Sequence, residues 1–565
     1  MSLSASNPPE SRQFFAPASR WRPNPWTAAT LLVALVVAVP ILSIPGLALF
    51  PRENIWPHLA STVLPGYVLT TLGLMLGVTF GVLTMGVTSA WLVTMCRFPG
   101  RRIFEWALLL PMAVPAYVIA YVYTDLLEYA GPVQSFLRQL FGWQNAADYW
   151  FPEIRSLAGA VAMMSLVLYP YVYLLSRAAF LEQSVGLLDA SRTLGCGPWA
   201  TFFRVSLPMA RPSIATGVAL ALMETLNDVG TVDFFAVHTL TFGIYDVWLN
   251  MGNIGGAAQI AMVMLVFVMI LLTIERQSRR RHKHYQSSGR LKALPAHRLE
   301  GARAHLAFVA CLLPVAAGFI VPMVVLLSNS IRYFDESWTP EFLRYALNSV
   351  ALSFAAAAAA ICVALLLAYG KRLVNSRTVS SAVSFSSFGY AVPGAVLAIG
   401  VIIPLAGFDN ALDALLREHF GISSGLLFSG TVFAVLFAYV VRFLAVALGS
   451  VDSSLSKVTP AMDMAARTLG HGPMDTFFKV HLPLIRGGVL IGVLVVFVDC
   501  MKELPATLIL RPFNFETLAT YVYQFASDEL IEQASLGALG IVLAGLIPVV
   551  VLSRVITATR QTQSR

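Results

Sequence analysis

The chain has 565 residues, of which 57% are hydrophobic and 12% are charged, and its formal net charge is +8. With a mean hydropathy of +0.72, it carries more apolar surface than one soluble core can bury, which excludes an ordinary soluble globular protein. Only helices and closed barrels satisfy their own backbone in lipid, and apolar runs of about 20 residues favour helices. The composition therefore predicts an all-α, polytopic membrane protein.

Apolar runs separated by charged or turn-forming stretches predict about twelve membrane-spanning helices. The first clear run is 27–50, and further clear runs follow at 68–93, 257–274 and 349–370. The predicted spans begin near residues 27, 67, 105, 157, 213, 257, 304, 346, 379, 425, 487 and 534. The first run is too long for the apolar part of a cleavable signal peptide, so we expect it to be retained as a span.

Basic residues give the expected orientation, because lysine and arginine are retained preferentially on the cytoplasmic side. With the N-terminus inside, the cytoplasmic segments hold about 30 of the 38 Lys and Arg residues, the opposite loops hold about seven, and one lysine stays inside a span. Both termini are therefore expected in the cytoplasm, as tails at 1–26 and 557–565. Topology and contact with acidic lipid headgroups explain the positive charge, so no nucleic-acid partner is predicted.

A polar segment occurs twice in this apolar sequence. Residues 189–208 and 464–483 agree at 13 of 20 positions with an offset of 275 residues. Shorter matches lie upstream and downstream of it: 113–120 with 391–398, and 224–231 with 499–506. The repetition predicts two homologous halves of about six spans each, at 27–275 and 304–556, joined by a basic cytoplasmic linker at 276–303. An even number of spans places both copies on the same, cytoplasmic side.

Each copy of the repeat predicts a helical elbow. In the first copy a short helix is expected to end at Gly195 in a left-handed cap, and Pro198 favours a new helix start. On the second helix Trp199, Phe202 and Phe203 are spaced to share one apolar face, and Pro208 is expected to stop that helix. An interfacial helix packed on lipid would explain one copy, but two equivalent elbows favour a pair of equivalent partners.

These residues resemble a known family. The pattern acidic-Ala-small-x3-Gly-x9-aliphatic-x-Leu-Pro is similar to the EAA loop of binding-protein-dependent ABC importer permeases, at 186–208 and again at 461–483. The resemblance implies a type I importer permease fold with pseudo-twofold halves, whose loops form coupling helices that sit in clefts of ATP-binding subunits. The ATPase-coupling candidates are Asp189, Ala190, Gly195, Phe202, Phe203 and Pro208, with Ala465, Gly470, Phe477, Phe478 and Pro483 in the second copy. The second copy departs from the pattern, because Met464 stands at the place of the acid and Asp463 lies one residue earlier.

Residues 27–556 as a whole resemble the fused two-copy permeases of ferric-iron importers, most clearly at 224–253 and 499–529. The resemblance implies ferric iron as substrate. Fused thiamine and phosphonate permeases share the architecture and remain alternatives. A secondary transporter could also have twelve spans, but it gives no reason for duplicated cytoplasmic elbows.

The sequence also indicates which functions partner proteins must supply. It has no GxxxxGK[ST] loop, so we expect no catalytic site and no bound cofactor here, with ATP acting through two copies of a separate ATPase subunit. It has no large region outside the membrane, so a periplasmic binding protein is expected to capture the substrate. The expected assembly has one copy of this chain in a bacterial inner membrane, and the histidines and cysteines predict no metal site.

Charged side chains inside the apolar runs indicate the translocation path. A charge at a helix centre costs roughly 2.5–3.5 kcal/mol on insertion scales, so such groups usually face a partner or a water-filled cavity. The candidates are Glu224, Asn227 and Asp228 in the first half, and Asp499, Lys502 and Glu503 in the second. Their spacing predicts one helical face in each half, with Lys502 neutralising Asp499 or Glu503. Buried pairs that only tie spans together are the alternative. Val114-Pro115 and Val392-Pro393 are predicted to kink their spans near the periplasmic side.

Overall fold

The computed structural model describes residues 25–181, 183, 185–280, 297–374 and 376–563. The predicted N-terminal tail up to residue 24 and most of the predicted linker, 281–296, lie outside the described residues. Within the described part, eleven helices are long and apolar enough to cross a membrane, or twelve if one bent pair counts as a span. The predicted all-α polytopic fold and its number of spans are confirmed.

The first half is built from helices separated by short breaks. Its elements are α1 (Pro25–Leu49), α2 (Trp56–Ser61), α3 (Leu64–Met95), β1 (Cys96–Arg97), α4 (Arg101–Ala107), η1 (Leu110–Ala113), α5 (Ala116–Leu127), α6 (Pro132–Phe141), η2 (Ala146–Asp148), α7 (Leu157–Leu181), α8 (Val185–Thr193), α9 (Pro198–Thr201), η3 (Phe202–Ser206), α10 (Leu207–Asn227), α11 (Gly230–Phe234), α12 (Leu240–Tyr245), η4 (Asp246–Asn250) and α13 (Ile254–Arg280).

The second half repeats this order of long and short elements. They are β2 (His297–Arg298), α14 (Ala302–Val315), η5 (Ala316–Ile320), α15 (Val321–Arg332), α16 (Phe334–Ser337), α17 (Pro340–Val374), α18 (Arg377–Ser386), η6 (Ser387–Ala391), α19 (Gly394–Phe420), α20 (Val432–Leu455), α21 (Pro460–Thr468), α22 (Pro473–Thr476), η7 (Phe477–His481), α23 (Leu482–Met501), α24 (Pro505–Leu510), α25 (Leu518–Ser527) and α26 (Ile531–Gln563).

Three predicted boundaries differ from the structure. Helix α13 runs to Arg280, past the expected end of the first half, and α26 runs to Gln563, so residues 557–563 continue the last helix instead of forming a tail. The end of the linker is attached to the first half, because β2 pairs in parallel with β1, with Cys96 opposite His297. Polar residues at a helix end do not stop a helix when no glycine or proline interrupts its hydrogen bonds.

The two halves exchange their first spans. Helix α1 packs against α17, α18 and α19 of the other half, and the span α14–η5–α15 contacts α3, α4, η1 and α7 of the first half. The approach of α1 to α19 is close, because a Cβ at Gly400 would lie 2.1 Å from the carbonyl oxygen of Pro40. The Ser43 hydroxyl donates to the Gly400 carbonyl at 2.9 Å at this crossing. The exchange makes one interlocked body from two repeats.

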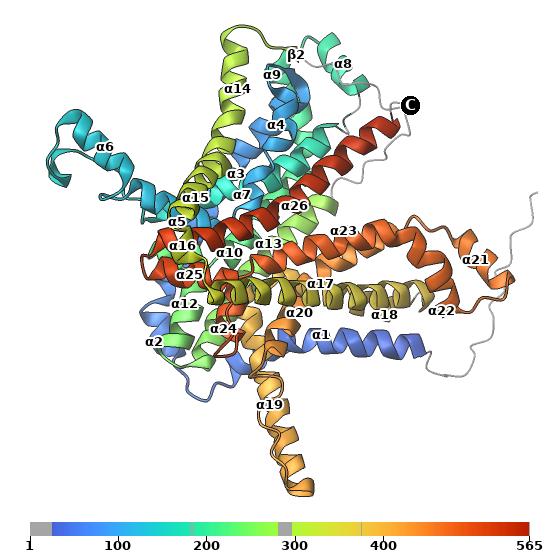
Figure 1. The fold of residues 1–565 in the computed structure, drawn as a ribbon. Coiled ribbons are helices and arrows are strands. Elements are labelled where there is room, and N and C mark those ends of the chain that lie inside the picture. The colour runs from blue at the N-terminus through green and yellow to red at the C-terminus, as the bar shows by residue number, and fades with distance from the viewer. Residues whose placement is uncertain (1–24, 182, 184, 281–296, 375, 564–565) are drawn as a thin grey trace, which may run out of the picture.

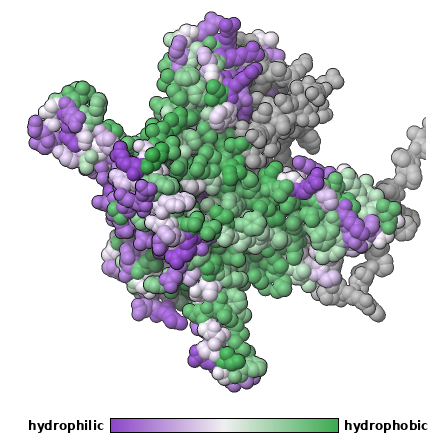
Figure 2. All heavy atoms as spheres, in the orientation of Figure 1, coloured by the Kyte–Doolittle hydropathy of each residue, from purple (hydrophilic) through white to green (hydrophobic). Residues whose placement is uncertain are grey.

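The molecule has two diverging lobes joined at a common centre (Figure 1). Helices α8 and α9 lie at the end of one lobe, and α21 and α22 lie at the end of the other. Two arms, one at α6 and one at the outer end of α19, leave the opposite side of the centre. Hydrophobic side chains cover the middle of the surface, and hydrophilic side chains gather on the lobe ends (Figure 2). This distribution fits a body surrounded by lipid, with polar ends in water.

Candidate translocation site and coupling elbows

The fifth and eleventh spans end inside the protein, near its centre. Helix α10 ends at Asn227 and α23 ends at Met501, so Asp228, Lys502 and Glu503 lie just beyond the helix ends. The prediction that each set shares one helical face is therefore wrong.

The local sequence explains these breaks. Asp228 Oδ1 accepts a hydrogen bond from the Thr231 amide at 2.7 Å, and Glu503 Oε1 accepts one from the Ala506 amide at 3.2 Å. Each acid thus satisfies an amide at the start of the following short helix, α11 or α24. Pro505 has no amide to continue α23.

All six predicted path residues nevertheless meet. They line one cavity of about 90 Å³ together with Tyr117, Tyr171 and Arg442. The kink predicted at Val114-Pro115 is present, since the helices on its two sides are bent by 91°. It lines this central cavity, so it lies deeper than the periplasmic position that we predicted.

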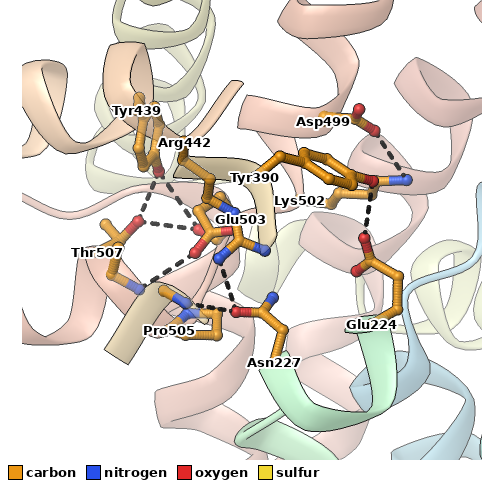
Figure 3. Close-up of polar contacts among 12 residues, drawn as sticks. Glu224, Asn227, Tyr390, Tyr439, Arg442, Asp499, Lys502, Glu503, Pro505 and Thr507 are labelled. Carbon is orange, nitrogen blue, oxygen red and sulfur yellow. Dashed lines mark hydrogen bonds and ion pairs between the residues drawn. The ribbon is translucent and has the colours of Figure 1, made fainter. Parts of the chain in front are cut away.

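Arg442, on α20, was not among the predicted site residues. Its Nη1 donates to Asn227 Oδ1 at 2.7 Å, and its Nε lies 3.3 Å from Glu503 Oε2 (Figure 3). The side chains of Arg442 and Glu503 are each 4% exposed, so this is a buried ion pair. A lone arginine in the middle of an apolar run is costly in lipid unless it has a partner, and this signal could have identified it.

Asn227 connects the two halves at the cavity. Besides the bond from Arg442, its Oδ1 accepts a hydrogen bond from the Gly394 amide at 2.7 Å. Gly394 follows the predicted break at Val392-Pro393, where the extended backbone separates η6 from α19. A Cβ at Gly394 would lie 2.6 Å from Glu503 Oε1 and 2.9 Å from Arg442 Nη1, so any larger residue here would displace the ends of these two side chains.

The remaining acids have separate partners. Glu224 Oε1 accepts a hydrogen bond from the Tyr390 hydroxyl at 3.1 Å, and Lys502 Nζ lies 3.2 Å from Asp499 Oδ1. The predicted pairing of Lys502 with Asp499 is present, while Glu503 forms its ion pair with Arg442. The four carboxyl groups exceed the two basic groups that line the cavity. Within the described residues no group of three or more metal-ligating side chains is arranged to hold a metal ion.

Both elbows have the predicted helix, glycine and proline order. Gly195 and Gly470 adopt φ of +80° and +82° after α8 and α21. The predicted stop after the second short helix is wrong, because Trp199–Asn227 and Pro473–Met501 are continuous helical spans. The amide of Leu207 bonds to the Phe202 carbonyl, five residues earlier. This π-type turn accommodates Pro208, which lacks an amide, without breaking the helix.

The aromatic rings of the first elbow contact one another, as predicted for residues on one face. The Trp199 and Phe203 rings stack with centroids 6.3 Å apart, and the Phe202 and Phe203 centroids lie 4.8 Å apart. Their exposure nevertheless differs. Phe202 is 8% exposed and packs against Trp91, with ring centroids 4.7 Å apart, whereas Trp199 and Phe203 are 72% and 59% exposed. In the second elbow Phe478 is exposed, and the ring of Phe477 packs against the ring of Tyr369 with their centroids 4.9 Å apart.

The coupling candidates therefore divide by exposure. Those on the surface are Asp189, Ala190, Gly195, Phe203, Ala465, Gly470, Phe478 and Pro483, while Pro208 and Phe477 are half-buried and Phe202 is buried.

Asp463 has an internal role in the second elbow. It accepts from Arg372 Nη2 at 2.8 Å and lies 2.6 Å from His481 Nε2, while Met464 is 60% exposed. Partial burial opposes ionisation, but the hydrogen bonds from Arg372 and His481 outweigh it and hold the pKa of Asp463 below its usual range. Its equivalent in the first elbow is Leu188, which is buried. Asp463 therefore anchors the elbow and does not replace the missing surface acid.

A two-halved membrane body with matched elbows at two lobe ends, and with broken spans around a central polar cavity, defines a transport permease. Residues 82–283 match the family described as the binding-protein-dependent transport system inner membrane component. Residues 82–283 therefore form a domain of this family, and the chain is an ABC importer permease with a two-copy organisation.

Named relatives agree with this assignment. The chain is 25% identical over 490 residues to the Fe(3+)-transport system permease protein FbpB 2 of Haemophilus influenzae, which covers 86% of this chain and 88% of that protein. It is 29% identical over 198 residues to the molybdenum transport system permease protein ModB of Escherichia coli K12, covering 34% of this chain and 83% of the relative. The sulfate permease CysT of the same strain is 26% identical over 249 residues, which is 43% of this chain and 86% of CysT.

The family settles several general points. The chain is a multi-pass protein of the inner membrane and a transport subunit, not an enzyme, and ATP hydrolysis takes place in separate subunits. Its partners are an ATPase and a periplasmic binding protein.

Proposed function

We propose that this permease moves ferric iron, delivered by a periplasmic binding protein, into the cytoplasm. The observation that carries the proposal is the extent of the match to the Fe(3+) permease, which covers 86% of the chain and therefore reaches into both halves. The molybdenum and sulfate permeases match 34% and 43% of the chain. Thiamine and phosphonate lack a comparable observation.

The chemistry of the cavity supports a cation as substrate. Carboxyl groups outnumber basic groups there, and both basic residues already have acidic partners. Acidic linings favour cations in membrane pores, whereas an oxyanion such as molybdate or sulfate would be repelled. Carboxylate oxygens are hard ligands that suit a hard ion. With no metal-holding cluster among the described residues, the cavity would pass the ion on instead of retaining it.

The elbows supply the coupling to ATP. A single helix of about 40 Å connects the exposed surface of the first elbow with Glu224 and Asn227, and the second elbow is connected with Asp499 in the same way. Closure of two ATPase subunits beneath the elbows would move these helices as rigid levers and open the cavity alternately to the two sides. Both termini and both elbows lie in the cytoplasm, one fused chain meets two ATPase copies, and the chain binds no cofactor of its own.

Uptake by the reconstituted complex tests the substrate. Proteoliposomes that contain the permease and its ATPase would be given ATP inside. Each sample would receive one candidate binding protein outside, loaded with its own ligand: ferric iron, molybdate, sulfate, thiamine or a phosphonate. We expect ATP-dependent accumulation of iron alone. Accumulation of another substrate without iron would refute the ferric-iron proposal and leave the permease class intact.

The assembly is tested separately. Native mass spectrometry of the purified complex should give one permease chain with two ATPase copies. Cysteine labelling from the two sides of the membrane should place 189–208 and 464–483 on the cytoplasmic side. Labelling of the two segments from opposite sides would eliminate the coupling scheme.

A further inference from the structure

Two arms extend from the centre on the side opposite the elbows. The first arm is residues 132–150, which comprise α6 and its return loop, and the second arm is residues 403–429, which comprise the outer part of α19 and its return loop. We propose that both arms lie in the outer headgroup region of the bilayer, with their apolar faces in lipid. The proposal uses the orientation given above, with the elbows in the cytoplasm, and does not depend on the substrate.

The first arm has its polar face inside and its apolar face outside. Gln134 is buried and donates to the Leu127 carbonyl at 2.7 Å, and Arg138 donates to the Tyr129 carbonyl at 2.8 Å. On the other side of α6, Phe136 and Leu140 are 62% and 61% exposed. A helix in water exposes its polar face and buries its apolar face, so the exposed apolar face of α6 requires an apolar partner.

The second arm shows the same inversion with different residues. Asp409 is 1% exposed and accepts hydrogen bonds from the Ser429 amide and hydroxyl, both at 2.7 Å. Asp413, one turn later, accepts from the Ser424 amide at 2.8 Å. Phe408 and Leu415 point outward and are 55% and 51% exposed. The return loop thus satisfies the acidic face of the helix and leaves its apolar face open.

The two arms are equivalent in the repeat. Gly142 follows α6 and Gly421 follows α19, both in the left-handed conformation with φ of +71° and +65°. The separation of these glycines, 279 residues, is close to the repeat offset. The sequences of the arms differ, and their polar anchors differ, yet both keep an exposed apolar face. Retention of this feature in both copies indicates that the face is used.

The occupant follows from continuity with the lipid-facing surface. Helix α19 is uninterrupted from Gly394, whose amide donates to Asn227, to Phe420, and hydrophobic side chains continue from the middle of the molecule along it (Figure 2). The arms leave the centre in different directions and point away from each other (Figure 1). One binding protein seated over the central entrance would not cover both outward faces. Trp150, the last residue of the first arm, is 85% exposed and is of the residue type that gathers at membrane interfaces.

Spin-label accessibility tests the position of the arms in the intact complex. Single substitutions Phe136→Cys and Leu415→Cys would carry the label on the apolar faces, with Gln144→Cys and Asn410→Cys as controls at exposed polar positions. Cys196→Ser and Cys362→Ala would remove the native thiols that are not buried. Each labelled complex, in vesicles of bacterial phospholipid, would be measured with oxygen, which concentrates in lipid, and with a nickel chelate, which stays in water.

We expect labels at positions 136 and 415 to collide several-fold more with oxygen than with nickel, and the two controls to show the reverse. Equal nickel access at all four positions would place the arms in water and overturn the proposal. Nickel access at 136 and 415 that is lost only when loaded binding protein is added would overturn it in favour of a protein partner. A failure of iron uptake would not alter these ratios, so the two proposals fail separately.

Discussion

Arg442 of the second half donates a 2.7 Å hydrogen bond to Asn227 of the first half, and this contact has no symmetric counterpart. The repeat offsets of 278 residues upstream and 275 residues downstream place Met164 or Val167 opposite Arg442, and the offset of 275 places Lys502 opposite Asn227. Both basic residues of the cavity therefore come from the second half. The repeats form a pseudo-twofold scaffold, but the chemistry at its centre is asymmetric.

The buried ion pair gives a prediction on stability. Arg442→Met leaves Glu503 buried without its partner, so we expect a loss of about 3–5 kcal/mol, because an unpaired buried charge is costly. The double variant Arg442→Met with Glu503→Met removes both charges and should recover most of this loss. Thermal unfolding in detergent, followed by size-exclusion chromatography, measures both. A double variant no more stable than the single one would contradict this account of the pair.

The path hypothesis predicts a loss of transport without a loss of folding. Glu224→Gln and Asp228→Asn keep the shape of each side chain but remove its charge. Glu503 is left in place, because its loss would leave Arg442 buried without its charged partner. Combined, they should reduce ATP-driven iron uptake by at least tenfold, while the unfolding temperature stays close to that of the parent. Glu418→Gln, at an exposed site on the second arm, is the matched control. If the double variant is stable and still transports iron, these residues only tie the spans together.

The first elbow offers a neighbouring pair with opposite exposure. Phe203→Ala removes an exposed ring, so we expect weaker co-purification of the ATPase and an unchanged unfolding temperature. Phe202→Ala removes the buried ring that packs against Trp91 and leaves a cavity, which should cost about 3–5 kcal/mol of stability. Pull-down of the ATPase and thermal unfolding of the isolated permease separate the two effects. Loss of ATPase binding from Phe202→Ala alone, in a stable permease, would reverse these assignments.

The anchor of the second elbow predicts a pH dependence. Because the pKa of Asp463 is lowered in the folded protein, its carboxylate contributes stability above the ordinary aspartate pKa of about 3.9 and loses it as the pH falls through the lowered value. Asp463→Asn should therefore unfold at a lower temperature than the parent near neutral pH.

This difference should shrink as the pH falls below about 4. Met464→Glu, at an exposed neighbour, should leave the unfolding temperature unchanged. A constant gap between the parent and Asp463→Asn from pH 7 to pH 3 would show that Asp463 does not act through its charge.

The sequence alone determined the number of spans and the duplication. Each span is a local property, because an apolar run long enough to cross the bilayer must form a helix to satisfy its backbone. The elbows could also be predicted from the sequence, since Gly195 and Gly470 are needed where the chain takes a positive φ. The six charged or polar candidates could be identified from their cost in lipid.

Only the tertiary structure decided which apolar side chains face protein and which face lipid. In water the two faces of a helix differ in polarity, but in a membrane both the interior and the surroundings are apolar, so the sequence of α1 carries no sign that it packs on the opposite half. The same holds for Phe202 and Phe203, which are neighbours of one residue type with opposite exposure. The pairing of Arg442 with Asn227 and Glu503 likewise depends on two halves meeting, a contact between distant residues that no local pattern encodes.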